Sequence, residues 1–420
     1  MKELAILFVG GGIETLPGIR LAKSFGLHVL VSDRRPDAPC MVEADAALIA
    51  NTYDVDESIA VAKRYHREVR PINGVMCMAT DVPLTVASIA AELGLPGISV
   101  DSARLVSDKL LMKDHLVAAG LPVPWYAAVR SLGELRQIVS DRGYPLVLKP
   151  VDSRGARGVL RLLEGIDLDW AFFTSKSFSP TERVMVEEFL GGPQISTESI
   201  AVQGEVFTLG FSDRNYEFLD RYAPNIIENG GDLPSVLLAA DQKSICDTLH
   251  DAARSFAIVN GVVKGDMVLS DGKPFIIEVA LRPSGGYFCS HQIPLNTGVD
   301  LVAKAIRLAL GQPIDPIELR PRCNRAVCQR YFFPEPGWVD AIYVPNWISQ
   351  DSDIALFELR VSPGDVVPKP ISHPARAGVV IATGKDRADA KERAERAIRE
   401  TVITTSSDSI SSSSISLTAN

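Results

Sequence analysis

The sequence predicts a mixed protein, with an α/β domain at its N-terminus followed by α+β regions. Three observations support this class. The 420 residues are too many for one core and are enough for two or three domains. Apolar runs alternate with helical patterns over residues 1–97, which is typical of a parallel, doubly wound sheet. From about residue 126 this alternation is replaced by strands and hairpins, which is typical of α+β regions.

Residues 1–97 are expected to form a Rossmann-like domain. The first apolar run stops at three glycines, and a helical pattern and further strands follow it. Strands that alternate with helices pair in parallel, so one sheet with helices on its faces is predicted. Its elements are a strand at 4–9, a helix from residue 16, strands at 28–31 and 74–78, and a helix at 83–93.

The glycine turn at residues 10–12 raises the question of dinucleotide binding. Asp33 follows about 20 residues later, as the acid that binds ribose does in such proteins. The spacing differs, because the third glycine of the G-x-G-x-x-G pattern would fall at Thr15. We therefore interpret the segment as a tight strand-to-helix turn that could line a substrate site, and not as an NAD site.

A linker helix is expected over residues 98–125, with Asp101 or Ser102 as its N-cap and Gly120 as its C-terminal stop. The region after it, 126–319, has the pattern of an α+β domain. Its elements are helices at 132–141 and 300–310, strands at 146–149, 184–189, 196–202 and 205–210, and a hairpin at 262–279.

The sequence pattern changes from about residue 320. Residues 320–402 are expected to form a small closing domain, with a charged helix at 387–399. The serine-rich residues 403–420 carry one charge and no sustained period, so a disordered tail is predicted.

Composition argues against several classes of function. The net charge of -9 offers no basic face for a nucleic acid. No run approaches the roughly 18 apolar residues of a membrane span, and the N-terminal residues do not fit a signal peptide. We therefore expect a cytoplasmic protein with no membrane or nucleic-acid partner. The six cysteines form no C-x-x-C pair, which argues against a zinc site.

A lysine, Lys149, ends an apolar strand and is followed by a loop rich in glycine and arginine. The lysine ammonium and the loop's backbone N–H groups can surround an anion. Gly155 and Gly158 allow close approach of the backbone and hinge motion. Taken alone, the loop is explained more simply as an exposed hairpin.

A second constellation lies in the segment 264–286. The turn residues SDGK predict a hairpin centred near Gly272, and Asp266 and Glu278 stand at equal distances from that glycine. Directly opposed carboxylates about 5 Å apart repel each other unless a cation lies between them. Magnesium bound to phosphates through one or two carboxylates fits this arrangement. Strand parity adds Ala280 and Arg282 to the face of Glu278, where the guanidinium could bind a carboxylate or phosphate.

A third segment, 184–200, is an apolar strand that ends in two acids and a glycine-rich turn. Backbone groups from Glu187 to Leu190 could hydrogen-bond a purine edge. Gln194 or Glu198 could reach ribose hydroxyls or a lysine. Alone, this segment indicates no particular function.

The three segments, in this order, resemble the ATP-grasp superfamily. The resemblance covers residues 1–402, and the N-terminal and linker segments look like those of carbamoyl phosphate synthase large chains, biotin carboxylases and purine-pathway carboxylate ligases. It implies an ATP-grasp fold of two α+β subdomains over 126–319. Residues 126–188 would form the subdomain that carries the ATP lid, and residues 189–319 the subdomain for metal and substrate.

The resemblance also implies roles for individual residues. Asp266 and Glu278 would bind Mg²⁺ or Mn²⁺, and Arg282, Lys149 and Arg157 would act in catalysis by electrostatic stabilisation. Contacts to ATP would come from Lys109, Lys149, Asp152, Ser153, Gly155, Gly158, Glu187, Glu188, Phe189, Leu190 and Gln194.

Two positions depart from the superfamily pattern. Ala280 stands where many members have an asparagine that contacts the metal, and Gln194 takes the place of the ribose-binding glutamate. The segment EVALRPSGG looks most like that of amino-acid and peptide ligases. A pocket for the substrate carboxylate is therefore expected from Arg282, Ser284, Gly285, Gly286 and His291.

The expected function is an ADP-forming ligase that activates a carboxylate, most simply an amino acid, and joins it to an amine or second amino acid. Its partners would be small-molecule carboxylates and amines, and the resemblance suggests a homodimer. Two alternatives stay open. One is a purine-pathway ligase that uses formate or bicarbonate, and the other is a nucleotide-binding regulatory protein without catalysis.

Overall fold

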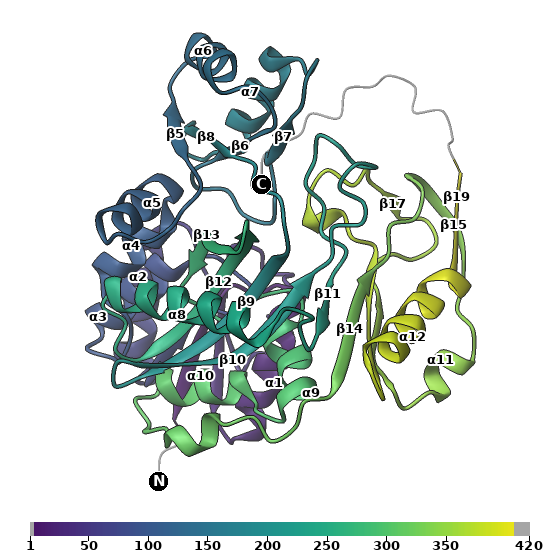
Figure 1. Cartoon of the computed structure of the whole chain (residues 1–420). Coiled ribbons are helices and arrows are strands. Elements are labelled where there is room, and N and C mark those ends of the chain that lie inside the picture. The colour runs from purple at the N-terminus through teal and green to yellow at the C-terminus, as the bar shows by residue number, and fades with distance from the viewer. Residues whose placement is uncertain (1–3, 407–420) are drawn as a thin grey trace. The chain divides into compact units, whose positions relative to one another are not determined.

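The computed structural model describes residues 4–406. The chain forms two compact units, each made of several chain segments (Figure 1). Unit 1 contains Met1–Val123, Gly192–Ser212 and Ser235–Asn324, and unit 2 contains Pro124–Gly191, Asp213–Pro234 and Arg325–Asn420. Because the units interleave along the chain, the domain boundaries expected from the sequence stay predictions.

Unit 1 begins with the expected parallel sheet, in the strand order β3-β2-β1-β4. All five residues of β1 are buried, so this strand lies in the middle of the core. The strands are β1 (Ala5–Val9), β2 (His28–Asp33), β3 (Ala46–Ile49) and β4 (Gly74–Met76), and the helices are α1 (Leu16–Ser24), α2 (Val55–Glu68) and α3 (Pro83–Glu92). The doubly wound α/β class is thus confirmed.

The rest of unit 1 is built on an antiparallel set of strands in the order β13-β12-β9-β10. They are β9 (Gln194–Val202), β10 (Glu205–Arg214), β12 (Gly261–Ser270) and β13 (Lys273–Ala280), and the helices are α4 (Val100–Ser107), α5 (Lys109–Ala118), α8 (Ala239–Ser255), α9 (Ile293–Thr297) and α10 (Leu301–Ala309). Apolar side chains of α4, α5 and α8 pack with β9, β12 and β13 in one core. The α+β expectation for this region is confirmed.

The prediction of a single linker helix over residues 98–125 is wrong, because this segment contains two helices. The chain leaves the helical conformation at Asp108, whose φ of -129° and ψ of 119° are extended, so α4 and α5 are separate helices. Ser99 is the N-cap of α4, in place of the expected Asp101 or Ser102. The Asp108 carboxylate caps α5 by accepting from the N–H groups of Leu110 and Leu111.

Unit 2 contains a small antiparallel sheet in the order β5-β8-β6-β7. Helices α6 and α7 pack on one face and form a core with it. The elements are β5 (Tyr126–Val129), α6 (Leu132–Arg142), β6 (Leu146–Pro150), β7 (Leu160–Leu162), α7 (Leu168–Ser177) and β8 (Val184–Glu188). The helix and the two strands expected between residues 126 and 189 are present as α6, β6 and β8, whereas β5, β7 and α7 were not expected.

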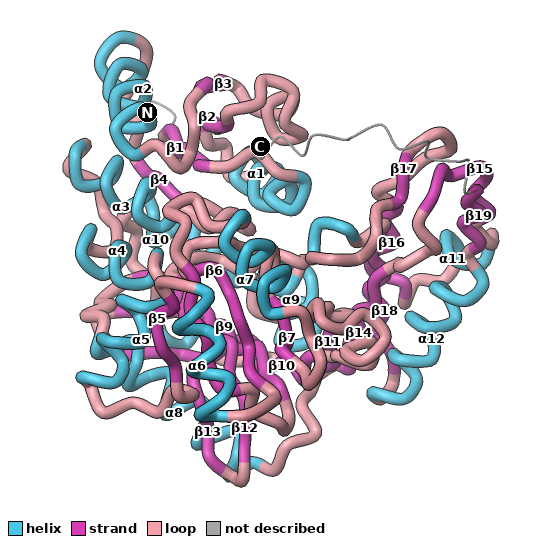
Figure 2. The backbone as a smooth tube through the Cα atoms, turned by 90° about the horizontal axis from the view of Figure 1, so that it is seen from above, coloured by secondary structure: helices cyan, strands magenta, loops and turns pink. Residues whose placement is uncertain are grey.

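The C-terminal part of unit 2 has strands in the order β11-β14-β18-β16, with α12 beside β14 and β18 (Figure 2). The elements are β11 (Gly231–Leu233), β14 (Ala326–Tyr331), α11 (Trp347–Gln350), β16 (Ile354–Leu359), β18 (Gly378–Gly384) and α12 (Arg387–Glu400), and a second sheet holds β15 (Gly337–Tyr343), β17 (Val366–Val367) and β19 (Val402–Ser406). The predicted disorder is wrong for residues 403–406, which pair with β15. Residues 407–420 lie outside the described residues.

Within residues 4–406, no helix has the length and apolar character that a membrane span requires.

Candidate functional site

Lys149 and Glu187 form a buried ion pair in unit 2. They lie on the neighbouring strands β6 and β8, and the Lys149 Nζ is 2.5 Å from Glu187 Oε1. Leu148 and Val186 point into the core beneath α6 and α7, so strand alternation places both charged side chains on the opposite face. Only 4% of Lys149 and 3% of Glu187 is exposed. The buried ammonium of Lys149 therefore has a buried carboxylate as its counter-charge.

The loop after Lys149 is held at both ends. At its start, the Asp152 carboxylate accepts hydrogen bonds from Ser179 and from Thr181. At its end, Gly158 has a φ of +70°, and a Cβ there would lie 3.0 Å from Phe178 and Pro150. Between these anchors, Arg157 is exposed. Asp152 therefore has an observed role at the base of the loop, while ATP contacts of the loop stay a prediction.

Glu187 and Glu188 are the last residues of β8, and Phe189 and Leu190 follow the strand directly. Glu188 is exposed, and its N–H donates to the Trp125 carbonyl at 2.8 Å. Phe189 and Leu190 are half-buried, and the Arg161 guanidinium lies 5.6 Å from the centre of the Phe189 ring. In unit 1, Gln194 begins β9 and pairs with Val268. The structure thus places these candidates at strand ends, and their contacts to adenine and ribose stay predictions.

In unit 1, Asp266 and Glu278 lie directly opposite each other on β12 and β13, which confirms the predicted register. The hairpin reaches this register through a β-bulge. The turn pairs Ser270 with Lys273 and Met267 with Ile276, and Ile277 is then skipped before Asp266 meets Glu278. A regular ladder would have paired Asp266 with Ile277 instead.

The bulge also decides which face Glu278 occupies. Met267, Ile276 and Val279 all point into the core of unit 1. Two residues, not one, lie between Ile276 and Val279, so Glu278 is on the face away from the core, together with Asp266. Arg282 follows on this face by the same parity, as expected.

Each of the two opposed carboxylates has a lysine beside it. Lys264 Nζ is 2.6 Å from Asp266 Oδ2, and Lys109 Nζ is 2.9 Å from Glu278 Oε1. The Ser196 hydroxyl donates to the other Asp266 oxygen at 3.1 Å. The pair is thus balanced by cations, which answers the repulsion expected of opposed acids.

The loop after β13 is tied down by acids of unit 1. The Arg282 Nε donates to Asp81 at 2.8 Å, and the Ser284 N–H donates to Glu198 at 2.9 Å. The Gly286 N–H donates to Glu14 at 2.6 Å. The N–H groups of Ser284 and Gly286, two residues of the expected substrate-carboxylate pocket, are therefore bound by side chains of the protein.

Glu198 is fully buried and accepts from both the N–H and the hydroxyl of Ser284. Burial raises the pKa of its carboxyl to about 7, although the Ser284 hydrogen bonds and Lys264 act in the opposite direction. Ser284 is only 2% exposed. The structure thus gives Ser284 a role in fixing the loop, and its contact with substrate stays a prediction.

His291 lies in the π-helical turn Phe288–Gln292, which follows the loop after β13. Its Nδ1 is hydrogen-bonded to the Ser290 hydroxyl at 2.9 Å. The His291 ring packs edge-on against the Tyr287 ring, with the two ring centres 5.2 Å apart. It is half-buried. These contacts give the histidine a structural position, and its role toward substrate stays a prediction.

Sequence reasoning missed Glu14 and Asp81, which the fold brings to the loop from the ends of β1 and β4. Both follow a strand of the parallel sheet, and ligands of such sheets bind at the carboxyl ends of the strands. This position was the one signal that could have identified them. Asp33, in contrast, accepts from the Gly11 N–H at 2.8 Å. Residues 10–12 connect β1 to the short helix Ile13–Thr15, and their role toward a ligand stays a prediction.

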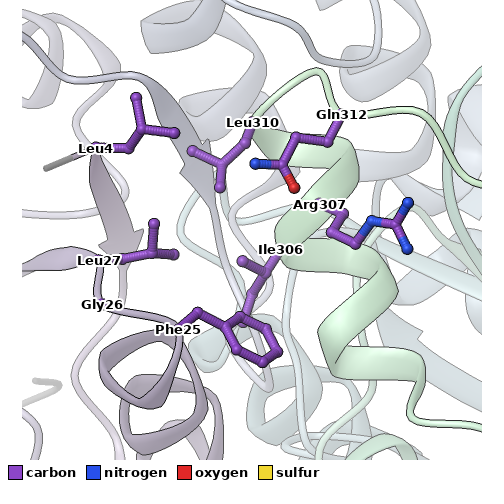
Figure 3. Close-up of a pocket in the computed structure, with 8 residues that line it drawn as sticks. All are labelled: Leu4, Phe25, Gly26, Leu27, Ile306, Arg307, Leu310 and Gln312. Atoms are coloured by element: carbon purple, nitrogen blue, oxygen red, sulfur yellow. The ribbon is translucent and has the colours of Figure 1, made fainter. Parts of the chain in front are cut away.

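A separate pocket of about 660 Å³ lies on another part of unit 1 (Figure 3). Leu4, Phe25 and Leu27 line one side of it, and Ile306 of α10 and Leu310, which follows that helix, line the other. None of the predicted site residues contributes to it, so this pocket is not the candidate site.

The family described as "ATP-grasp domain" matches residues 106–286, and the family "L-amino acid ligase C-terminal domain 2" matches residues 330–406. An uncharacterized protein y4rH of Sinorhizobium fredii is 24% identical over 405 residues, covering 95% of this chain and 82% of the relative.

Two relatives with assigned names also match over almost their whole length. Dapdiamide A synthase of Enterobacter agglomerans is 22% identical over 418 residues, covering 91% of this chain and 92% of the relative. The crystal structure of an L-amino acid ligase from Bacillus licheniformis superposes with a TM-score of 0.79 at 20% identity, covering 97% of this chain and 100% of that chain. The latter comparison confirms the fold.

Proposed function

The chain carries an ATP-grasp domain followed by an L-amino acid ligase C-terminal domain, and on this premise we propose that it is an ATP-dependent, ADP-forming carboxylate–amine ligase that activates an amino acid. One observation carries the proposal. Asp266 and Glu278 are opposed on one face of the hairpin, and Arg282 follows on the same face. Carboxylates for a metal and a guanidinium for a developing negative charge are the parts that phosphoryl transfer requires.

The proposed reaction has two steps. A carboxylate oxygen of the amino acid attacks the γ-phosphorus of ATP, the bond to the bridging oxygen breaks, and ADP leaves. The nitrogen of the second substrate then attacks the carbonyl carbon of the acyl phosphate. Inorganic phosphate leaves with one of the original carboxylate oxygens, and the amine loses a proton. Arg282 would stabilise the charge that develops on the attacked carbonyl.

The residues at the hairpin fit a magnesium ion. Asp266 and Glu278 offer carboxylate oxygens, the donors that magnesium prefers. Among residues 4–406, no cluster of three or more His, Cys, Asp and Glu side chains could hold a metal, so other ligands would come from ATP phosphates and water. When bound, the ion would neutralise charge on the transferring phosphate. Lys264 and Lys109 balance the acids without it.

Two lysines would bind the nucleotide phosphates, as the resemblance implies. Lys109 stands at the first position of α5 beside Glu278, and Lys149 is held by Glu187. Each lysine is thus prepositioned by a carboxylate, which lowers the entropy lost when an anion binds. Glu187, Leu190 and Gln194 would contact adenosine, as the resemblance implies.

The names of the relatives support an amino acid as the activated substrate. One solved structure of the same fold is titled L-amino acid ligase, and a relative along almost the whole chain is named dapdiamide A synthase. We propose no particular amino acid or amine.

The proposal is tested by ADP release from ATP and Mg²⁺ across a panel of amino acids, offered singly and in pairs, with mass spectrometry of the products. We expect ADP to form only with certain pairs, together with a conjugate that weighs one water less than its components. Stimulation by formate or bicarbonate with a ribose phosphate would favour the purine-type ligase instead. ATP binding without turnover on any substrate would favour the regulatory alternative.

A further inference from the structure

Residues 282–287, here called the substrate loop, end in a strained backbone conformation at Tyr287. Gly286 and Tyr287 are consecutive left-handed residues, with φ of +62° and +58°. A left-handed conformation is unfavourable for an aromatic residue and persists only where the surroundings enforce it. A π-helical turn, Phe288–Gln292, follows at once, and such turns are frequent at functional sites. The substrate loop therefore depends on contacts that hold it from outside.

Those contacts come from two directions within unit 1. Glu198 on β9 holds Ser284. On the other side, the segments that follow β1 and β4 supply the rest. The Ala79 N–H donates to the Pro283 carbonyl at 3.1 Å, Asp81 binds Arg282, and Glu14 binds the Gly286 N–H. Only Glu14 among these three reaches the left-handed part of the loop.

Glu14 is itself held in place. It belongs to the short helix Ile13–Thr15 that follows the glycine turn, and the Thr15 hydroxyl donates to the Met78 carbonyl at 2.8 Å. The neighbouring residue in the substrate loop, Gly285, leaves room for the Glu14 carboxylate, because a Cβ there would lie 2.7 Å from Glu14 Oε2 and 3.3 Å from the Ala79 Cβ. The loop and Glu14 are thus fitted to each other.

We propose that Glu14 is a positioning residue: its carboxylate binds the Gly286 N–H and so holds the substrate loop in the conformation that aims Arg282 at the reacting carboxylate. This inference rests on the proposed function, because Arg282 is the group that it positions. A charged acceptor binds an N–H more strongly than a neutral one, which suits a bond that must hold a strained backbone. The role of Glu14 is therefore to position the loop and not to bind substrate.

The test compares Glu14→Ala, which removes the acceptor, with Glu14→Gln, whose amide oxygen can still accept from Gly286. Glu43→Gln is the matched control. Glu43 lies in the same unit, and its carboxylate forms an ion pair with the exposed side chain of Arg20. Hydrogen exchange of residues 284–288 is measured in all variants, and it needs no substrate. Turnover is measured with the amino acids that stimulate ADP release by the wild-type protein.

We expect Glu14→Ala to speed exchange in residues 284–288 and to lower kcat about 100-fold, since a displacement of about 1 Å at a reacting group has this effect. The KM for ATP should change less than about twofold, because the predicted ATP contacts lie elsewhere. Glu14→Gln should keep slow exchange and stay within about threefold of wild type in kcat, and Glu43→Gln should match wild type.

Two results would overturn the inference. Unchanged exchange in Glu14→Ala would mean that Glu14 does not hold the loop. Loss of activity in Glu14→Gln equal to that in Glu14→Ala, with exchange still slow, would mean that the charge of Glu14 acts on a substrate ammonium. Absence of turnover in the wild-type protein would contradict the proposed function, whereas the exchange data would still decide the role of Glu14.

Discussion

Each of the two acids proposed to bind magnesium has a lysine beside it, so the site is a balanced set of two negative and two positive side chains. Lys264 stands next to Asp266, and Lys109 reaches Glu278 from α5. Removal of one charge would leave its partner uncompensated in a largely buried place, because the Lys109 side chain is only 12% exposed.

Replacement of Glu278 by glutamine should lower the rate of ADP release about 1000-fold or more, because a carboxylate that would bind the metal and neutralise Lys109 is lost. The readout is ADP release with the best substrates of the panel. Glu205→Gln, at an exposed position at the start of β10, should retain wild-type activity. Near-normal turnover of Glu278→Gln would mean that the site lies elsewhere.

Glu198 should make the stability of the protein depend on pH. Burial raises the pKa of its carboxyl from an ordinary 4.5 to about 7, so the folded state binds a proton that the unfolded state releases. The stabilisation is complete below pH 4.5 and is lost as the pH rises through 7. Between these values the free energy of unfolding should fall by about 3 kcal/mol because of this group.

The Glu198→Gln variant carries no such group, so its stability should change less over the same pH range. Urea denaturation at pH 5 and pH 7.5 measures the difference for wild type and variant. An identical pH dependence in the two proteins would show that Glu198 is not the titrating group.

Some residues of this site could be predicted from the sequence and others could not. Asp266 and Glu278 were found because a hairpin turn relates residues symmetrically, and Lys149 because it ends an apolar strand. Glu14, Asp81 and Glu198 act through contacts with residues 86 or more positions away. No local pattern marks such contacts, and the position of Glu14 and Asp81 after β1 and β4 was the one signal for these two residues.

At the scale of elements, the β-bulge at Ile277 places Glu278 opposite Asp266, on the face of the hairpin away from the core. The observed turn, Asp271 and Gly272, has two residues with positive φ, as the favoured hairpin turns do. A regular ladder from this turn would bring Glu278 onto the core face. The sequence predicted the correct pair from a turn centred on Gly272, and the bulge, which periodicity does not reveal, supplies the extra residue that this register requires.

The break between α4 and α5 should matter for stability. Asp108→Ala removes an N-cap that binds two N–H groups, so we expect a loss of about 1 kcal/mol in the free energy of unfolding. Asp101→Ala is the matched control, since Asp101 lies in the first turn of α4 and its side chain is 89% exposed. Its effect should stay within about 0.5 kcal/mol. Equal losses in both variants would contradict the assignment of Asp108 as the cap.

The glycine-rich loop at 152–158 should become protected when nucleotide binds. Its ends are anchored by Asp152 and Gly158, and the exposed Arg157 lies between them. Trypsin should therefore cut after Arg154 and Arg157 more slowly with ATP and Mg²⁺, because lids close on their ligand. Cleavage after Arg130, whose side chain is 82% exposed, serves as the reference. Equal rates with and without nucleotide would argue against a lid.

At the scale of the whole molecule, strongly apolar segments were predictable and weakly apolar ones were not. The fully buried β1 and the strands at 146–150 and 184–188 stand out as apolar runs. Strand β3 and helix α2 were missed. Helix α2 fully buries only Ser58 and Ala62, and β3 is a short edge strand. How chain segments combine into two interleaved units depends on long-range contacts, which a single sequence does not display.

The most direct test of the proposed chemistry follows the oxygen atoms. The amino acid that supports turnover is prepared with both carboxylate oxygens as ¹⁸O and is incubated with ATP, Mg²⁺ and the amine. Formation of an acyl phosphate predicts one ¹⁸O atom in the released phosphate and the other in the carbonyl of the product. Phosphate without label, or label in AMP, would contradict activation by an ADP-forming ligase.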